Sequence, residues 1–105
     1  MIGLLSATGK AIRNYEQQRS LLVDDLLVRF TPTEYTILCQ LLSGDIVSDT
    51  NLIQKTFITE QPDKTLKTCL DKHIENIRSK IRPTGLNIFR VNGFGYVLRN
   101  SPDQW

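Results

Sequence analysis

The residues best suited to chemistry lie in the stretch LDKHIENIRSKI, where cations, an amide and a histidine alternate with aliphatic side chains. Lys72 and Asn76 stand four residues apart, so a helix would place both on one line of its surface. In the major groove of DNA, lysine can donate to guanine O6 and N7, and asparagine can pair with adenine N6 and N7. This spacing predicts a base-reading pair, unless the polar face merely points to water. The flanking residues whose angles suit contacts with backbone phosphates are Thr68, Arg78 and Lys80.

His73 lies at the edge of the aliphatic pattern, next to Lys72. A catalytic base would need a nucleophile or a second acid nearby, and a metal ligand would need companions, but the chain contains one histidine. His73 is either a packing or surface residue or a phosphate contact at the margin of a DNA-reading helix, and we predict the phosphate contact. The sequence also has no Walker loop, nucleophile elbow or plausible carboxylate pair. We therefore expect no enzyme activity, no metal and no cofactor.

The segment VNGFGYVL predicts a β-hairpin. Asn92 and Gly93 allow a sharp turn, and Gly95 allows close approach of another backbone. From such a wing, Arg90 could reach into a minor groove or a row of phosphates. The alternative is a plain hairpin that completes the core. In either case two aromatic side chains are expected to be buried, Phe94 and Tyr96.

Two helices are expected before the helix that contains LDKHIENIRSKI. In TPTEYTILCQLLSG, Thr31 and Glu34 have capping-box spacing around a proline that suits a first helical turn, and Gly44 ends the pattern. The apolar face of this helix is formed by Tyr35, Ile37, Leu38, Leu41 and Leu42. In SDTNLIQKTF, Ser48 or Asp49 is the expected N-cap. The buried side of this second helix is formed by Leu52, Ile53, Thr56 and Phe57.

The third helix is predicted from about Lys64 to Ile81, with Asp63 as its N-cap. At about 100° per residue, its aliphatic residues fall in one narrow stripe. They are Leu66, Leu70, Ile74, Ile77 and Ile81. The opposite face would therefore be free to meet a partner.

Short strands are expected between residues 9 and 30, with a tight hairpin at Asp24 and Asp25. Strands, helices and a terminal hairpin in this order predict an α+β fold. We expect a winged helix-turn-helix with a short N-terminal antiparallel sheet, three helices and a C-terminal β-hairpin wing. Residues 1–8 would be a leader or linker remnant, 9–100 the domain and 101–105 a tail.

The bulk composition is that of one globular domain, with 105 residues, 40% hydrophobic and 23% charged. The net charge of +2 is small, but residues 1–62 carry five cations and seven acids, whereas residues 63–105 carry eight and four. This asymmetry is expected of a face that meets an anionic polymer. No apolar run is long enough for a membrane span. Cys39 and Cys69 form no disulfide or zinc pattern, so we expect structural thiols in a reducing cytoplasm.

Four motifs together resemble the OmpR/PhoB-type winged-helix effector domain of two-component response regulators, over residues 9–99. FTPTEYTILCQLL resembles L-T-x-x-E-[FY]-x-L-L-x-x-L, and VSDTNLIQKTF resembles V-S-R-x-x-L-x-x-x-V-W with Phe57 in the place of tryptophan. LDKHIENIRSKI resembles V-D-V-H-I-x-x-L-R-x-K-L, and IFRVNGFGYVL resembles I-x-T-V-R-G-x-G-Y-x-L. Their shared order and spacing make the resemblance specific.

The resemblance implies a sequence-specific double-stranded DNA-binding transcriptional regulator that works as a dimer on direct-repeat half-sites. In the family a phosphorylated N-terminal receiver domain promotes dimerisation, so we expect the chain to be the C-terminal effector domain of a response regulator or of a receiver-less relative. The resemblance also implies that the loop between the second and third helices contacts RNA polymerase. The residues of that loop are Ile58, Thr59, Glu60, Gln61 and Pro62.

The sequence departs from the family pattern at several positions. Asn92 replaces the wing arginine, and Arg90 stands where the family has threonine. Glu75 replaces a frequent phosphate-contacting cation. Cys69 occupies a position where a threonine often donates to phosphate, so the resemblance implies a DNA-backbone contact at Cys69. We expect a different target sequence and a weaker electrostatic affinity. Because of Glu75, Asn92 and the small net charge, a winged helix repurposed for protein–protein contact is the alternative.

Overall fold

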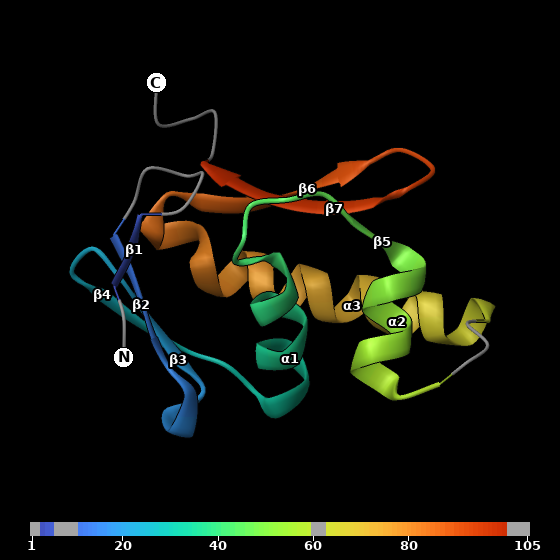
Figure 1. Ribbon diagram of the computed structural model, residues 1–105, viewed down its shortest axis with the longest axis horizontal. Coiled ribbons are helices and arrows are strands. Elements are labelled where there is room, and N and C mark those ends of the chain that lie inside the picture. Colours follow the sequence, from blue (N-terminus) through green and yellow to red (C-terminus); the bar gives the residue numbers. More distant parts are fainter. Residues whose placement is uncertain (1–2, 6–10, 60–62, 101–105) are drawn as a thin grey trace.

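A computed structural model describes residues 3–5, 11–59 and 63–100 of the chain. Three helices lie between a four-stranded sheet at the N-terminal end and a three-stranded sheet that carries a long hairpin (Figure 1). The helices are α1 (Pro32–Leu41), α2 (Asp49–Phe57) and α3 (Lys64–Ile81). The described residues also form two short 3-10 turns, η1 (Glu16–Gln18) and η2 (Arg82–Thr84). The predicted winged helix-turn-helix is therefore confirmed.

The N-terminal sheet is an antiparallel meander of β1 (Gly3–Leu5), β2 (Ala11–Tyr15), β3 (Ser20–Val23) and β4 (Leu26–Arg29). Its inner face buries Ile12, Leu21 and Val23 against the helices. Asp24 adopts the left-handed conformation, with φ +51°, that was expected at the β3–β4 turn. The strand β1 lies inside the segment that the sequence predicted to be a leader, so the sheet begins earlier than expected.

Side-chain caps fix where each helix begins. Thr31 accepts from the backbone N–H of Glu34, and the Glu34 carboxylate accepts from the backbone N–H of Thr31, which completes the predicted capping box. Ser48, rather than Asp49, caps α2. Asp63 accepts from the backbone N–H of Leu66 at 2.9 Å and caps α3, as predicted.

The core is centred on the aliphatic stripe of α3. Leu70, Ile74, Ile77 and Ile81 are fully buried, whereas Leu66 is only half-buried. They pack among aliphatic residues of α1 and α2, namely Ile37, Leu38, Leu41, Leu52 and Ile53. Each buried aliphatic side chain contributes about 2 kcal/mol through removal from water. This packing fixes the rotation of α3, and so decides which face remains outside.

The C-terminal sheet has the order β5-β7-β6, with β5 (Val47–Ser48), β6 (Leu86–Val91) and β7 (Gly95–Asn100). Gly93 takes φ +72° in the hairpin turn. A Cβ on Gly95 would lie 1.8 Å from the carbonyl oxygen of Val47, so glycine is required for β5 to pair with β7. Tyr96 is buried as predicted, but the prediction for Phe94 was wrong. Phe94 is 50% exposed because it follows the turn outside the sheet's packed face.

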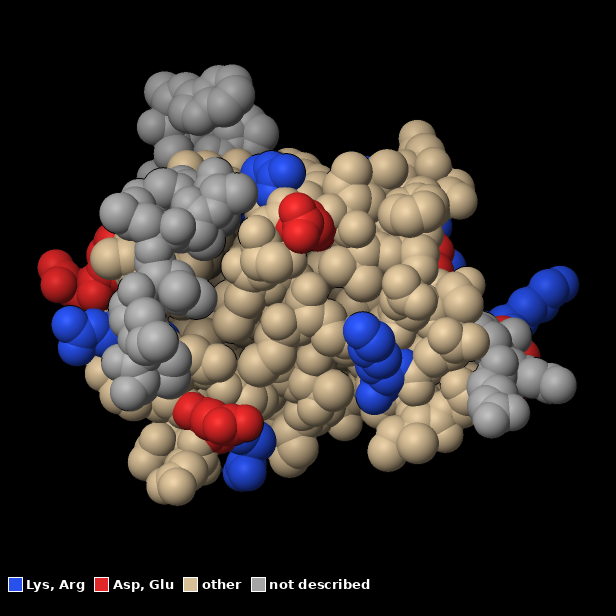
Figure 2. Space-filling model, in the orientation of Figure 1, with Lys and Arg blue, Asp and Glu red and all other residues tan. Residues whose placement is uncertain are grey.

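The face formed by α1, α2 and the sheet edges is weakly charged. Figure 2 shows isolated positive and negative side chains on this face, separated by broad uncharged surface. An anionic polymer would find no continuous positive field here. None of the described helices is long and apolar enough to cross a membrane.

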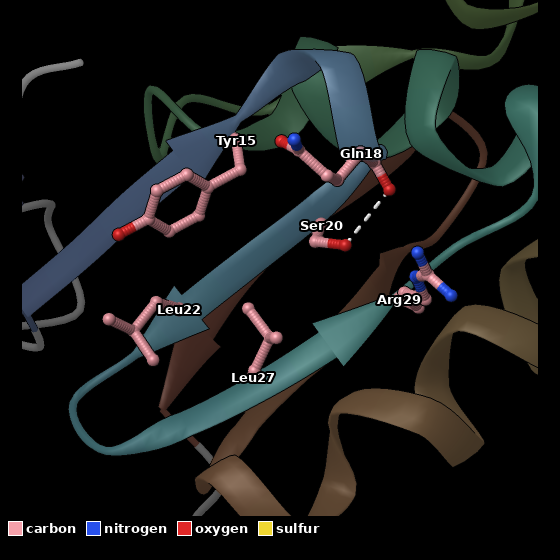
Figure 3. Close-up of a pocket in the computed structure, with 6 residues that line it drawn as sticks. All are labelled: Tyr15, Gln18, Ser20, Leu22, Leu27 and Arg29. Atoms are coloured by element: carbon pink, nitrogen blue, oxygen red, sulfur yellow. Dashed lines mark hydrogen bonds between the residues drawn. The ribbon is translucent and has the colours of Figure 1, made fainter.

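A cavity of about 570 Å³ opens on the N-terminal sheet (Figure 3). Its lining is formed by Tyr15, Gln18, Ser20, Leu22, Leu27 and Arg29. The Ser20 hydroxyl donates to the carbonyl of Gln18 at 2.9 Å, and most of the remaining lining is apolar. The lining contains one charged group, Arg29.

Candidate nucleic-acid interface

The outward face of α3 is a row of small and polar side chains on a rigid helix. Thr65, Thr68, Cys69, Lys72, Asn76 and Ser79 are all exposed. Lys72 and Asn76 lie on one line, as the sequence predicted, and Lys72 makes no ion pair within the part of the chain described here. Both side chains are therefore available to an external partner.

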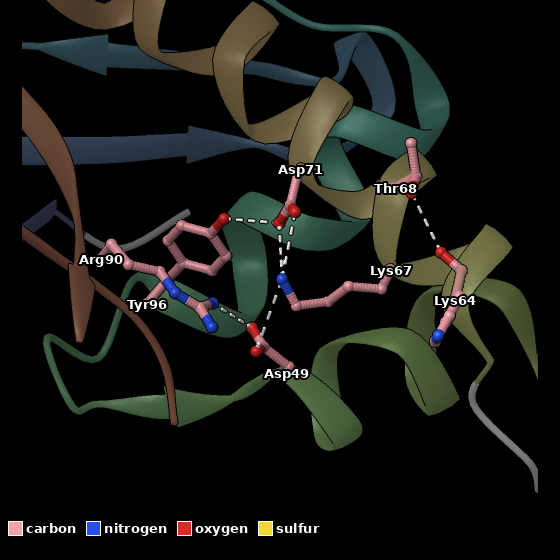
Figure 4. Close-up of polar contacts among 7 residues, drawn as sticks. All are labelled: Asp49, Lys64, Lys67, Thr68, Asp71, Arg90 and Tyr96. Carbon is pink, nitrogen blue, oxygen red and sulfur yellow. Dashed lines mark hydrogen bonds and ion pairs between the residues drawn. The ribbon is translucent and has the colours of Figure 1, made fainter. Parts of the chain in front are cut away.

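Thr68 and Cys69 are exposed toward the N-terminal half of this face. The Thr68 hydroxyl donates to the carbonyl of Lys64 at 3.0 Å (Figure 4), so it would have to rotate before it could donate to a phosphate. Cys69 is a free thiol. Neither side chain has a position that prevents the phosphate contact predicted for it.

Lys80, which was predicted to contact a phosphate, forms an ion pair with a carboxylate of α1, and its phosphate contact stays a prediction. Its Nζ donates to Oε1 of Glu34 in α1 at 2.5 Å, and the Glu34 side chain is only 4% exposed. Burial raises the pKa of Glu34, but bonds from Lys80 and from the backbone and hydroxyl of Thr31 together outweigh burial and lower it. Lys80 is therefore the counter-ion of a buried carboxylate and ties α3 to α1.

Arg78 is likewise held inside the protein. Its Nε donates to the carbonyl of Ile88 in β6 at 2.7 Å, and its Nη1 donates to the Glu75 carboxylate. The side chain is 25% exposed. The guanidinium therefore joins α3 to the C-terminal sheet, and the phosphate contact of Arg78 stays a prediction.

His73 packs between α3 and α2. Its ring lies 6.4 Å from that of Phe57, and its Nδ1 is buried without a hydrogen-bond partner among the described residues. A phosphate contact would therefore have to come from the other ring nitrogen, Nε2. His73 packs as one interpretation expected, and its phosphate contact stays a prediction.

The base of the wing is closed by an ion pair that the sequence did not predict. Arg90 donates from Nη1 to Oδ1 of Asp49 at 2.6 Å, and its guanidinium lies 4.9 Å from the centre of the Tyr96 ring (Figure 4). The bond to Asp49 raises the pKa of Arg90. The charge of Arg90 is paired with the first residue of α2, so its predicted reach into DNA would have to compete with this ion pair.

Asp71 extends this contact to α3. It accepts from the Tyr96 hydroxyl at 2.6 Å and pairs with Lys67 at 3.0 Å, and Lys67 also lies 3.9 Å from Asp49 (Figure 4). Burial and the Asp71 carboxylate raise the pKa of Tyr96 to about 12. We call Asp49, Lys67, Asp71, Arg90 and Tyr96 the wing latch. It joins α2, α3 and the wing, and only the four-residue spacing of Lys67 and Asp71 was visible in the sequence.

Comparison with known proteins identifies the architecture. Residues 25–98, well over half of the chain, match the family model described as the C-terminal domain of transcriptional regulatory proteins. The chain belongs to this family. Its fold is that of the winged-helix DNA-binding domains of response regulators, and the protein is a DNA-binding transcriptional regulator.

Solved response-regulator domains superimpose well on this regulator. The DNA-binding domain of CpxR from E. coli is 21% identical, with 96% of this chain and 99% of that chain covered and a TM-score of 0.71. The C-terminal domain of the nisin resistance regulator NsrR is 29% identical over 85% and 92%, with a TM-score of 0.68. The AdeR DNA-binding domain, solved with an intercistronic region, is 22% identical over 85% and 93%, with a TM-score of 0.67. No curated protein sequence matches the chain.

The wing turn of the regulator presents the remaining predicted positions. Asn92 and Gly93 are exposed at its tip, and a Cβ on Gly93 would meet no atom within 4 Å. The turn is therefore open to an external backbone. Of the predicted DNA contacts, the structure leaves Lys72, Asn76, Thr68, Cys69, Asn92 and Gly93 accessible.

Proposed function

We propose that the regulator recognises a specific double-stranded DNA sequence by placing the outward face of α3 in the major groove. The observation that supports this proposal is that Lys72 and Asn76 are both exposed and form no ion pair with other described residues. The buried stripe of α3 fixes the rotation of the helix that presents them. Lys72 would donate to guanine and Asn76 would pair with adenine. Thr68 and Cys69 would contact phosphates, as would the wing turn at Asn92 and Gly93.

Two further cations support this arrangement. Lys64 and Arg82 are exposed at the two ends of α3 and make no ion pair within the described chain. We propose them as phosphate contacts beside the base-reading pair, in addition to Arg78 and Lys80, which also bond to groups of the protein. Lys64, Lys72 and Arg82 are the exposed cations of α3 and its end that form no ion pair within the described chain. Because these cations are few, the affinity for non-specific DNA should be modest and should fall with increasing salt concentration.

The loop after α2 is the proposed contact with RNA polymerase. Ile58 is 90% exposed and has a φ of +50°, a conformation that β-branched residues rarely adopt. Thr59 is also described, whereas Glu60, Gln61 and Pro62 lie outside the described residues. An Ile58→Ala variant should keep its DNA affinity and lose transcription activation.

The regulator is also proposed to bind as a dimer in the cytoplasm, on direct-repeat half-sites. Analytical ultracentrifugation on duplexes with one or two half-sites tests this. Two copies on the double site and one on the single site are expected. One copy on both would contradict the dimer.

Selection of bound duplexes from a random pool, followed by affinity measurements, tests DNA recognition. Lys72→Ala and Asn76→Ala should each relax the preference at one base pair, by on the order of 1–3 kcal/mol. Lys55→Ala, an exposed lysine on α2, is the matched control and should leave the preference unchanged. If neither variant on α3 changes the preference, the base-reading assignment is wrong.

A further inference from the structure

Glu75 places a carboxylate on a helix face that is proposed to meet an anionic polymer. Its side chain is 66% exposed, and it stands three residues after Lys72 and next to Asn76. Phosphates repel such a charge, and an exposed ion pair on a helix contributes little stability. Neither a phosphate contact nor helix stability accounts for a carboxylate at this position.

The carboxylate is nevertheless held in a defined orientation. Its Oε1 accepts from Nη1 of Arg78, and Arg78 is itself anchored to the Ile88 carbonyl at 2.7 Å. Glu75 is thus fixed through Arg78 to the C-terminal sheet, and part of its charge is neutralised. Its second oxygen, Oε2, makes no hydrogen bond within the described residues. One acceptor atom is therefore oriented but unused.

We infer that Glu75 is a specificity-determining residue that accepts a hydrogen bond from the 4-amino group of a cytosine in the major groove. This inference rests on the proposed function of α3. An ionised carboxylate can only accept hydrogen bonds, so it is repelled by guanine O6 and N7 and by thymine O4. Adenine offers an amino group beside the acceptor N7, whereas cytosine offers its amino group alone.

The neighbours of Glu75 constrain where that cytosine lies. Side chains three residues apart on a helix are neighbours, with Cβ atoms about 5–6 Å apart. The cytosine read by Glu75 should therefore lie within about two base pairs of the guanine read by Lys72. A selected site is expected to contain both bases in close succession, with the adenine of Asn76 beside them.

The test uses duplexes in which each cytosine of the selected site is replaced in turn by 2-pyrimidinone, which lacks the 4-amino group. For the wild-type protein, one such replacement should weaken binding by about tenfold. With Glu75→Ala, the same replacement should change nothing, and the affinity for random duplex should rise because a repelled charge is gone. Glu16→Ala, which removes an exposed carboxylate outside α3, is the matched control and should keep the cytosine dependence.

A second variant reverses the preference instead of removing it. The amide of Glu75→Gln carries a donor and an acceptor, which match adenine N7 and N6, so selection should change from cytosine to adenine at that one position. The inference is overturned if Glu75→Ala raises the affinity for every duplex equally and the effect of 2-pyrimidinone is the same with and without Glu75. Sequence preference would then persist, and the proposed function would stand. If the wild-type protein prefers no duplex over random DNA, the proposed function and this inference both fail.

Discussion

The inner flanks and the outward face of α3 carry similar residue types, but their side chains make different contacts. On the flanks, Lys67, Arg78 and Lys80 each donate to a protein carboxylate or carbonyl. On the outward face, Lys72 and Asn76 are exposed, and neither forms an ion pair with another described residue. The difference shows that the positive charge of residues 63–105 overstates what DNA can meet, because several of its cations stabilise the fold.

The wing repeats this contrast with two glycines. Gly95 faces inward, where a Cβ would lie 1.8 Å from the Val47 oxygen and 2.7 Å from Ser48 Cα. Gly93 faces outward, where a Cβ meets nothing within 4 Å. Glycine is therefore required at position 95 by the close backbone of β5, and at position 93 only by the left-handed conformation of the turn.

The largest expected effect follows from the two glycines. Gly95→Ala should lower the free energy of unfolding by about 3 kcal/mol, because β5 must separate from β7 to admit the methyl group. Gly93→Ala should cost only about 1 kcal/mol, because the left-handed turn is strained for alanine but the space is open. Urea unfolding of both variants checks the ranking. Equal losses would show that Gly95 is not closely packed in solution.

The second largest expected effect on stability concerns two lysines of α3, Lys80 on a flank and Lys72 on the outward face. Lys80→Met should lower the free energy of unfolding by about 2 kcal/mol, because it leaves the buried Glu34 carboxylate without its counter-ion. The salt dependence of DNA binding should be unchanged. Lys72→Met should leave stability within about 0.5 kcal/mol and reduce the salt slope of DNA binding by about one.

These two variants are measured by urea unfolding and by DNA titration at several salt concentrations. If Lys80→Met reduces the salt slope while Lys72→Met does not, the two lysines have exchanged roles and the contrast between flank and face is wrong.

The smallest expected effect is a pH dependence of stability in the wing latch. Burial raises the pKa of Asp71, but bonds from Tyr96 and Lys67 together outweigh it and lower the pKa. Its contribution is therefore present above the unfolded pKa of about 3.9 and is lost as the pH falls through the folded value. Because the side chain is 43% exposed, solvent screening keeps this contribution below about 1 kcal/mol.

Unfolding measurements between pH 2 and 6 compare wild type with Asp71→Asn. Glu34, whose pKa is also lowered, contributes to the same pH range in both proteins, so the difference between them isolates Asp71. The variant should lose less stability on acidification than wild type. If the free energies of unfolding of the two proteins change in parallel with pH, the charge of Asp71 does not stabilise the wing latch.

Local patterns predicted the elements because each depends on neighbouring residues. The Thr31 capping box, the Asp63 cap and the 3.6-residue aliphatic period of α3 act within a few positions of the chain. The hairpin at Asn92 and Gly93 is equally local. Phe94 was the exception, because its burial depended on how the turn projects from the packed sheet.

The sequence by itself determined the fold, the N-caps at Thr31 and Asp63, the buried stripe of α3 and the exposure of Lys72 and Asn76 opposite that stripe. Tertiary structure alone decided which cations are free. Lys80 meets Glu34 across 46 positions of sequence, and Arg90 meets Asp49 across 41. A periodic pattern places a side chain on a face of its own helix, but it does not show which carboxylate another element brings to that face. The ion pairs of these cations therefore became visible only when the helices and the wing were packed together.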